Sequence, residues 1–158
     1  MTLTDLAELC DVFYIGGTKC GALFGEAVVI PQKGRIPHFF TIIKQHGALL
    51  AKGRIAGIQF GELFTDGLYQ RIGKPAMEAA EQIKAALKKY GYQLSLDTPT
   101  NQIFCIVSNE VMKKIAQDVE FGFWEKYDET HSVIRFATSW ATTMEDTQKL
   151  IQILEKNK

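Results

Sequence analysis

The chain has 158 residues, of which 46% are hydrophobic and 23% charged, and its formal net charge is zero. This length suffices for one domain, or for the end of one domain followed by a second small one, and the composition is that of a globular protein with a core. A neutral chain has no excess charge to attract nucleic acid or an anionic membrane, and no apolar run reaches the length of a membrane span. Three cysteines without metal-ligand spacing and three scattered histidines indicate a cytoplasmic protein with reduced thiols and no metal site.

The N-terminal part contains a short helix at residues 2–10, with Thr4 as its expected cap, followed by the run VFYIGGTKCGALFGEAVVI at residues 12–30. Two apolar segments of strand length flank a glycine-rich turn that holds Lys19, a pattern that predicts two buried strands. A lysine between buried strands would be poorly solvated, and burial lowers the pKa of a lysine, so that its neutral amine can attack a carbonyl carbon. Lys19 is therefore a candidate Schiff-base lysine, toward a substrate or pyridoxal phosphate. The alternative is a surface lysine whose ammonium group stays in water.

Residues 38–72 contain no proline, and their apolar residues recur at helical spacing. Glycines punctuate this stretch, so we expect a break between Gly47 and Gly53. Glycines at four-residue intervals also permit close helix contacts, within the chain or with a second subunit. Gly73 ends the stretch, and Lys74-Pro75 begins a new helix that stops at Gly91. We therefore place a domain boundary here, with domains at residues 1–73 and 74–158.

The second domain alternates strand and helix patterns. Strands are expected at residues 92–96, 103–107, 119–124 and 132–138, and a short helix at 109–117. Thr142, with Glu145 three residues later, forms an expected capping box at the start of a last helix. These elements predict a small α+β domain, in which one sheet carries helices on one side.

Arg135 lies in the apolar run VIRF at residues 133–136, which predicts a strand. A buried arginine needs a partner, and its planar guanidinium suits a carboxylate held by two parallel hydrogen bonds. The residues leave two interpretations open, a salt bridge at a strand edge and a site for the carboxylate of a ligand.

The segment DVFYIGGTKCGALFGEAVVI at residues 11–30 resembles the lysine segment of the low-specificity threonine aldolases, also called the β-eliminating lyase family. Thr18, Lys19, Gly21 and Gly25 fit the family motif, roughly Ser/Thr-Lys-x-x-Gly followed by a second glycine. The resemblance continues weakly to the C-terminus. It implies an α/β fold of the aspartate-aminotransferase type. We expect the end of a pyridoxal-phosphate-transferase large domain, with two strands and a long helix, followed by a small α+β C-terminal domain.

The same resemblance implies site residues on the cofactor side. Lys19 is the expected catalytic lysine that binds pyridoxal phosphate, and Thr18 lies beside it in the motif. Lys44 matches a family lysine in a region that approaches the cofactor phosphate of a partner subunit. Lys52 or Arg54 matches a family arginine there, although the register slips. The alternative for all three basic residues is a solvated charge on a helix face.

On the substrate side, the resemblance implies that Arg135 binds the α-carboxylate of an amino acid. The family places an arginine in a strand with the pattern Ile/Val-Arg-Phe/Leu-x-Thr, which Arg135, Phe136 and Thr138 fit. The chain departs from the family at Ser139 and Trp140, where a histidine is often found.

The implied function is that of a pyridoxal-phosphate-dependent lyase that cleaves a β-hydroxy amino acid to glycine and an aldehyde. The family carries its ring-stacking aromatic residue and its pyridine-nitrogen aspartate in a longer preceding segment, and Asp11 is no substitute for that aspartate. We therefore expect a C-terminal portion of such an enzyme, with an amino acid as substrate, that forms a homo-oligomer or binds a complementing large-domain chain. Its two strands should then expose apolar surface. The alternatives are a truncated, non-catalytic remnant that folds and self-associates, and an unrelated small α/β binding domain.

Overall fold

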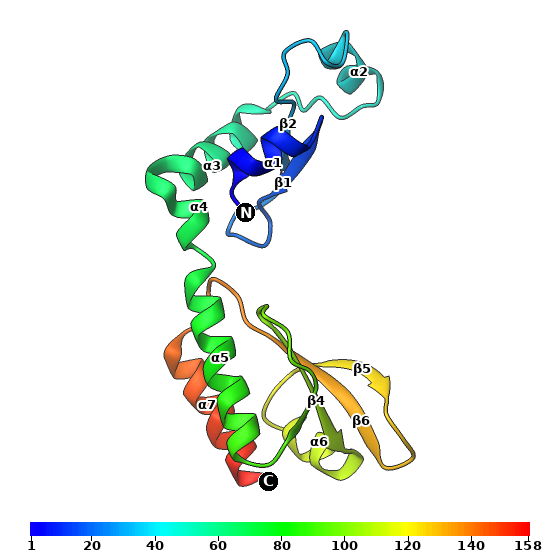
Figure 1. The fold of residues 1–158 in the computed structure, drawn as a ribbon, viewed down its shortest axis with the longest axis vertical. Helices are drawn as coiled ribbons and strands as arrows, with labels where there is room; N and C mark the ends of the chain where they lie inside the picture. Colours follow the sequence, from blue (N-terminus) through cyan, green and yellow to red (C-terminus); the bar gives the residue numbers. More distant parts are fainter. The chain divides into compact units, whose positions relative to one another are not determined.

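The computed structural model describes residues 1–158 throughout. The chain forms two compact units, unit 1 at Met1–Arg71 and unit 2 at Ile72–Lys158, and each is described here by itself (Figure 1). The domain boundary predicted from the sequence, between Gly73 and Lys74, lies two residues beyond this division. No helix of either unit is long and apolar enough to cross a bilayer.

Unit 1 contains a β-hairpin and several short helices. Its elements are α1 (Leu3–Leu9), β1 (Phe13–Gly16), β2 (Glu26–Val29), α2 (Phe39–Gln45), α3 (Arg54–Phe64), the 3-10 helix η1 (Thr65–Gly67) and α4 (Leu68–Arg71). The predicted cap of the first helix is wrong: Thr2, not Thr4, accepts the hydrogen bond of the Asp5 amide, and Asp5 in turn accepts that of Thr2. Thr2 is the N-cap because Asp5, three residues later, completes the reciprocal pair of hydrogen bonds of a capping box.

The helical stretch at residues 38–72 is interrupted twice. The break predicted between Gly47 and Gly53 is confirmed, since α2 ends at Gln45 and α3 begins at Arg54. A second interruption, which the sequence pattern did not predict, occurs at Asp66, where φ is 50°. The expected long helix is therefore a series of shorter ones.

The strands of unit 1 are not buried as predicted. Strands β1 and β2 pair antiparallel and alternate in exposure, because only one side of the hairpin is covered. The buried hydrophobic side chains of this unit are few: Ile15, Ala22 and Leu63. The expectation that these strands leave apolar surface exposed is confirmed by Tyr14 and Val28, which are 70% and 53% exposed.

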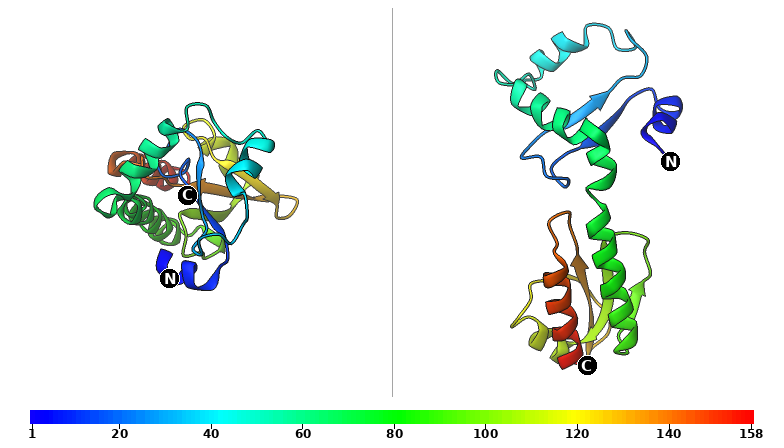
Figure 2. Two further views of the ribbon diagram at one scale, coloured as in Figure 1. Left: turned by 90° about the horizontal axis from the view of Figure 1, so that it is seen from above. Right: turned by 90° about the vertical axis from the view of Figure 1, so that its left-hand side faces the viewer.

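Unit 2 is an antiparallel sheet with helices packed on one face, as the sequence predicted. Its elements are α5 (Lys74–Lys89), β3 (Gln93–Leu96), β4 (Gln102–Ser108), α6 (Asn109–Ile115), β5 (Gly122–Lys126), β6 (His131–Ala137) and α7 (Met144–Lys156). The strand order is β3-β4-β6-β5. Helices α5 and α7 lie side by side along the sheet (Figures 1 and 2). Strand β5 begins three residues later than predicted.

The core of unit 2 lies between this sheet and its helices. It is formed by alternate residues of β4 and β6 together with one side of each helix: Ala80, Ile83, Leu87, Ile103, Cys105, Val107, Ile115, Ile134, Phe136 and Leu154. Burial raises the pKa of Cys105 to about 12, so this thiol stays protonated and serves as a small apolar side chain. The residues between these positions, Arg135 among them, lie on the opposite face of the sheet.

The N-terminus of α7 has a capping box one residue later than predicted. The Thr143 hydroxyl accepts from the Asp146 amide at 3.1 Å and donates to Asp146 Oδ2 at 2.6 Å. The predicted pair of Thr142 and Glu145 is wrong, because Thr142 Oγ1 accepts from the Ser139 amide, at 2.8 Å, in the preceding turn. Both pairs have the same spacing, so the pattern alone does not separate them.

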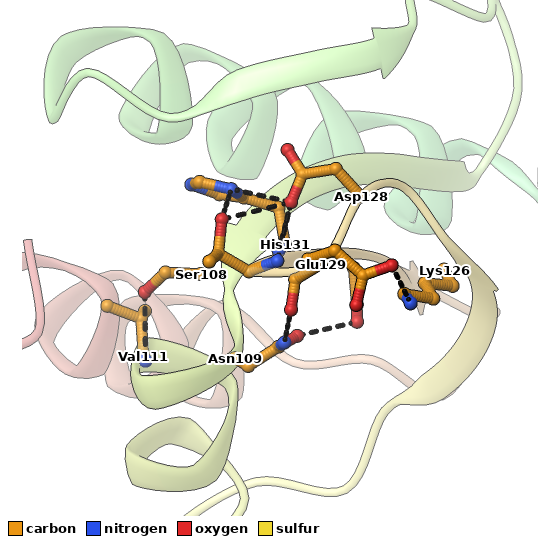
Figure 3. Close-up of polar contacts among 9 residues, drawn as sticks. Ser108, Asn109, Val111, Lys126, Asp128, Glu129 and His131 are labelled. Carbon is orange, nitrogen blue, oxygen red and sulfur yellow. Dashed lines mark hydrogen bonds and ion pairs between the residues drawn. The ribbon is translucent and has the colours of Figure 1, made fainter.

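The turn between β5 and β6 is held by polar contacts (Figure 3). One carboxylate oxygen of Asp128 accepts hydrogen bonds from the Thr130 and His131 amides, both at 2.7 Å. The Asn109 side chain donates to the Glu129 carbonyl oxygen and thereby connects this turn to the start of α6. The backbone and side-chain donors around Asp128, led by the Thr130 amide, lower the pKa of its carboxyl group to about 2.

Candidate functional site

Lys19 lies in the turn that follows β1, and its side chain is exposed. The turn is closed by hydrogen bonds from the Cys20 and Ala22 amides to the Gly17 carbonyl oxygen, at 2.9 and 3.0 Å. The predicted poor solvation of Lys19 is wrong for this chain, because the turn lies at the end of the hairpin, beyond the two strands. The Lys19 side chain thus presents an accessible primary amine on a hydrogen-bonded turn.

The turn packs closely against α3 at Gly17. A Cβ atom at this position would lie 2.8 Å from Ala22 Cβ and 2.9 Å from Phe60 Cζ, distances that side chains do not tolerate. Glycine therefore lets the backbone just before Lys19 contact the Phe60 ring of α3.

Two side chains from the helices fix the backbone on either side of this turn. Gln59 Oε1 accepts from the Leu23 amide at 2.6 Å, and the Tyr69 hydroxyl donates to the Gly16 carbonyl oxygen at 3.2 Å. Burial raises the pKa of Tyr69, and the nearby Cys20 thiol raises it further, so the phenol remains a donor. Helices α3 and α4 thus fix the position of the turn from which the Lys19 side chain extends.

The other predicted cofactor residues of unit 1 are also exposed. Thr18 precedes Lys19 in the same turn, and Lys44 lies in the last turn of α2. Lys52 and Arg54 are exposed at the start of α3. The exposure of these side chains is expected both for solvated surface charges and for ligand-binding groups without their ligand.

Ion pairing in unit 1 occurs between Arg35 and Asp11, at 2.7 Å. The ammonium groups of Lys19 and Lys44 therefore remain free of carboxylate partners. Asp11, which the sequence did not favour as the aspartate of a pyridine nitrogen, has an arginine partner.

Arg135 lies in β6 on the sheet face opposite the helices, with Phe104 of β4 and Gly122 of β5 as its cross-strand neighbours. Its Nη1 donates to Gln102 Oε1 at 3.3 Å, and its Cζ lies 5.6 Å from the centroid of the Trp124 ring. The side chain is half-buried. The guanidinium is thus held by a neutral amide and an aromatic ring.

No carboxylate of the chain pairs with Arg135. Every ion pair in unit 2 is made by a lysine or a histidine. The salt bridge that the sequence left open as an alternative is therefore absent, and the guanidinium has no anionic partner within the chain.

A cavity of about 970 Å³ opens beside Arg135 within unit 2. Its lining combines apolar and polar side chains from the segment before β5, from β6 and from α7, including Phe121, Gly122, Arg135, Phe136, Lys149 and Leu150. An apolar wall with a few polar groups is typical of small-molecule sites. Arg135 contributes to this lining, whereas its guanidinium lies with Gln102 and Trp124 on the sheet face opposite the helices.

Thr138, the last residue of the predicted strand motif, has a structural role. Its side chain is buried, and its hydroxyl donates to the Ala76 carbonyl oxygen at 2.6 Å. This bond connects the end of β6 to the first turn of α5. The threonine thereby fixes the strand that carries Arg135.

Sequence reasoning missed Gln102, Gly122 and Trp124 as neighbours of Arg135. The strand predicted from the sequence begins at residue 103, whereas Gln102 is the first residue of β4. The three residues meet only through the pairing of β4 and β5 with β6, which a single sequence does not specify. The usable signal was the alternation that places Gln102 and Phe104 on one strand face.

Comparison with known proteins identifies the family. No family model and no curated protein matches the chain. A solved structure, the threonine aldolase of Leishmania major, is 36% identical to it and superposes with a TM-score of 0.93 over 99% of the chain. The resemblance to the threonine aldolase family is thereby confirmed. The chain spans 46% of that aldolase's length.

More distant structures share the fold alone. Sphingomonas wittichii serine palmitoyltransferase is 12% identical, with a TM-score of 0.64 over 93% of this chain and 39% of its own. Another serine palmitoyltransferase, solved with its PLP internal aldimine, has a TM-score of 0.63 at 12% identity and the same coverage. The fold class predicted from the sequence, that of the pyridoxal-phosphate transferases, is confirmed by these matches and by the threonine aldolase.

Proposed function

We propose that this chain is part of a pyridoxal-phosphate-dependent lyase of the threonine aldolase type, which cleaves a β-hydroxy amino acid to glycine and an aldehyde. The observation that supports this most strongly is the 36% identity to the Leishmania threonine aldolase over almost the whole chain. The free thiols of Cys10, Cys20 and Cys105 support a reducing, cytoplasmic location.

Lys19 is the proposed cofactor-binding residue. Its accessible amine, free of an ion pair, has the chemistry to bond to the aldehyde carbon of pyridoxal phosphate. Thr18 supplies a hydroxyl group beside Lys19, a group suited to a phosphate, and Lys44 supplies a positive charge that we propose for the cofactor phosphate of a partner subunit. The chemistry of these groups therefore fits the cofactor. When bound, pyridoxal phosphate supplies the electron sink for cleavage of the Cα–Cβ bond.

Arg135 is the proposed carboxylate-binding residue. Its guanidinium lies on the sheet face opposite the helices, has no acid partner in the chain and can donate two parallel hydrogen bonds to an α-carboxylate. Such a pair would fix the orientation of the amino acid before bond cleavage.

The exposed apolar residues of unit 1 suggest a partner. Its exposed large hydrophobic side chains include those of Tyr14, Leu23, Val28, Phe40, Ile55 and Ile58. We propose that the remaining part of an aldolase fold covers them, in the same polypeptide or in a complementing large-domain chain. A truncated remnant would instead bury them by self-association, and its homo-oligomer would carry no activity.

The proposal is tested by adding pyridoxal phosphate to the chain, alone and joined to a large-domain segment, and recording the visible absorption spectrum. We expect a lysine-dependent band that is lost in Lys19→Ala and retained in Lys33→Ala, which removes another exposed lysine. Release of glycine and acetaldehyde from threonine then tests the reaction. A band without products would favour the remnant or a different amino acid, and the absence of a Lys19-dependent band in either form would refute the cofactor assignment.

A further inference from the structure

We propose that Gln102 and Gly122 are positioning residues that aim the guanidinium of Arg135 at the substrate carboxylate. The inference rests on the proposed role of Arg135 and adds the residues that orient its guanidinium for binding a carboxylate. Gln102 hydrogen-bonds the guanidinium, and we propose that it acts through the arginine rather than on the substrate.

Gly122 provides space for the guanidinium. It is the cross-strand neighbour of Arg135 in β5, and a Cβ atom there would lie 3.3 Å from Arg135 Nε and 3.4 Å from Nη2. The backbone does not demand glycine, because the φ of Gly122 is not positive. Because Gly122 has no side chain, Arg135 can lie across β5, and a Cβ atom there would require the guanidinium to shift by a few tenths of an ångström.

Gln102 holds the guanidinium without neutralising it. Its Oε1 accepts from Nη1, which leaves Nε and Nη2 without a partner in the chain. These are the two nitrogens that a side chain at position 122 would contact. They are also a pair that can bind both oxygens of one carboxylate.

The aromatic neighbours add support of the same kind. The Trp124 ring lies beside the guanidinium and is itself packed edge-on against Phe104, with ring centroids 4.9 Å apart. A cation–π contact stabilises the arginine and leaves its charge available. The Gln102 amide and the Trp124 ring contact the guanidinium, and the absence of a side chain at Gly122 leaves room for it. Together these features favour one conformation of Arg135 on the open face of the sheet.

The test follows the Nε–H signal of Arg135 in the NMR spectrum of the whole chain, assigned with Arg135→Lys. The order of this group is measured by its heteronuclear NOE, and binding by its shift on titration with glycine, the amino-acid product of the proposed reaction. In the wild type we expect an ordered signal that shifts. In Gln102→Ala we expect a mobile signal and an affinity about fivefold lower, because the amide oxygen that holds the guanidinium in place is lost.

Two further variants separate positioning from general stability. Gly122→Ala should displace the signal and weaken glycine binding by a similar factor, while the matched Gly73→Ala, where a Cβ atom meets open space, should not. Gln102→Glu should keep the group ordered but lose glycine binding, since its carboxylate competes for the guanidinium. Gln93→Ala is the matched control on another strand.

Each negative outcome has one meaning. A guanidinium that is equally ordered and binds glycine equally in Gln102→Ala and Gly122→Ala would overturn the positioning inference alone. An ordered wild-type guanidinium that does not respond to glycine would overturn the carboxylate role of Arg135 on which the inference rests.

Discussion

Tyr14 and Val28 lie directly opposite each other in the β1–β2 hairpin, and both side chains are more than half exposed. A cross-strand pair of apolar residues normally packs against a further layer. Elsewhere unit 1 exposes further large hydrophobic residues, among them Leu23 and Phe40. Apolar surface of this kind marks an interaction site or a tendency to aggregate.

We predict that replacing this pair, in the variant Tyr14→Ser/Val28→Ser, lowers self-association of the chain. The reason is the loss of apolar area that would otherwise be buried between molecules. Light scattering and the fluorescence of an apolar dye measure the effect. The matched change Tyr127→Ser, at an exposed tyrosine of unit 2, should leave both signals unchanged. Equal dye binding in all three proteins would contradict the assigned surface.

Thr138→Val should destabilise unit 2 by about 1–3 kcal/mol, because it removes a buried donor from the Ala76 carbonyl oxygen. Thr138→Ser retains the hydroxyl group and should lose much less. Urea unfolding of the two variants, followed by circular dichroism, checks the difference. A larger loss in Thr138→Ser than in Thr138→Val would show that the methyl group, rather than the hydrogen bond, matters.

The cap of α7 can be identified by titration. The Thr143 hydroxyl is the leading cause of the lowered pKa of Asp146. Thr143→Ala should therefore raise the pKa of Asp146 toward its ordinary value and destabilise the helix by about 1 kcal/mol. Thr142→Ala should leave that pKa unchanged. NMR titration of the Asp146 carboxyl carbon distinguishes the two, and a raised pKa in Thr142→Ala but not in Thr143→Ala would contradict the assigned cap.

Stability should depend on pH through Asp128. Its carboxyl pKa falls from 3.8 to about 2 in the folded state, so the charged form stabilises the turn above pH 4. That stability is lost as the pH falls from about 4 through 2, where the folded carboxylate also becomes protonated. We expect thermal unfolding of Asp128→Ala to vary less with pH in this window than that of the wild type. Parallel curves for the two proteins would exclude this role.

Local patterns predicted the elements of unit 2 well. The helix at Lys74–Lys89 has proline near its start and glycine after its end, β4 contains the continuous apolar run at residues 103–107, and β6 contains an apolar run that Arg135 interrupts. Strand β5 was placed too early because Val119 and Phe121 extend its apolar pattern, although they pack against the core outside the strand.

The site was less predictable, for two physical reasons. An apolar run beside Lys19 indicates burial only when a covering layer exists, and unit 1 leaves this lysine exposed. The neighbours of Arg135 come from strands up to 33 residues away, as with Gln102, and strand register is set by packing that a single sequence does not state. The family motif indicated Lys19 and Arg135, but it did not indicate the residues that fix the turn of Lys19 or contact the Arg135 guanidinium.

The central claim is that Lys19 is the cofactor-binding lysine. Borohydride reduction of the protein with pyridoxal phosphate, followed by peptide mass spectrometry, tests it most directly, with the chain joined to a large-domain segment. We predict that the cofactor is fixed to the peptide that contains Lys19, at close to one equivalent, and that Lys19→Ala abolishes this labelling. Labelling spread evenly over the exposed lysines, or unchanged in Lys19→Ala, would contradict the claim.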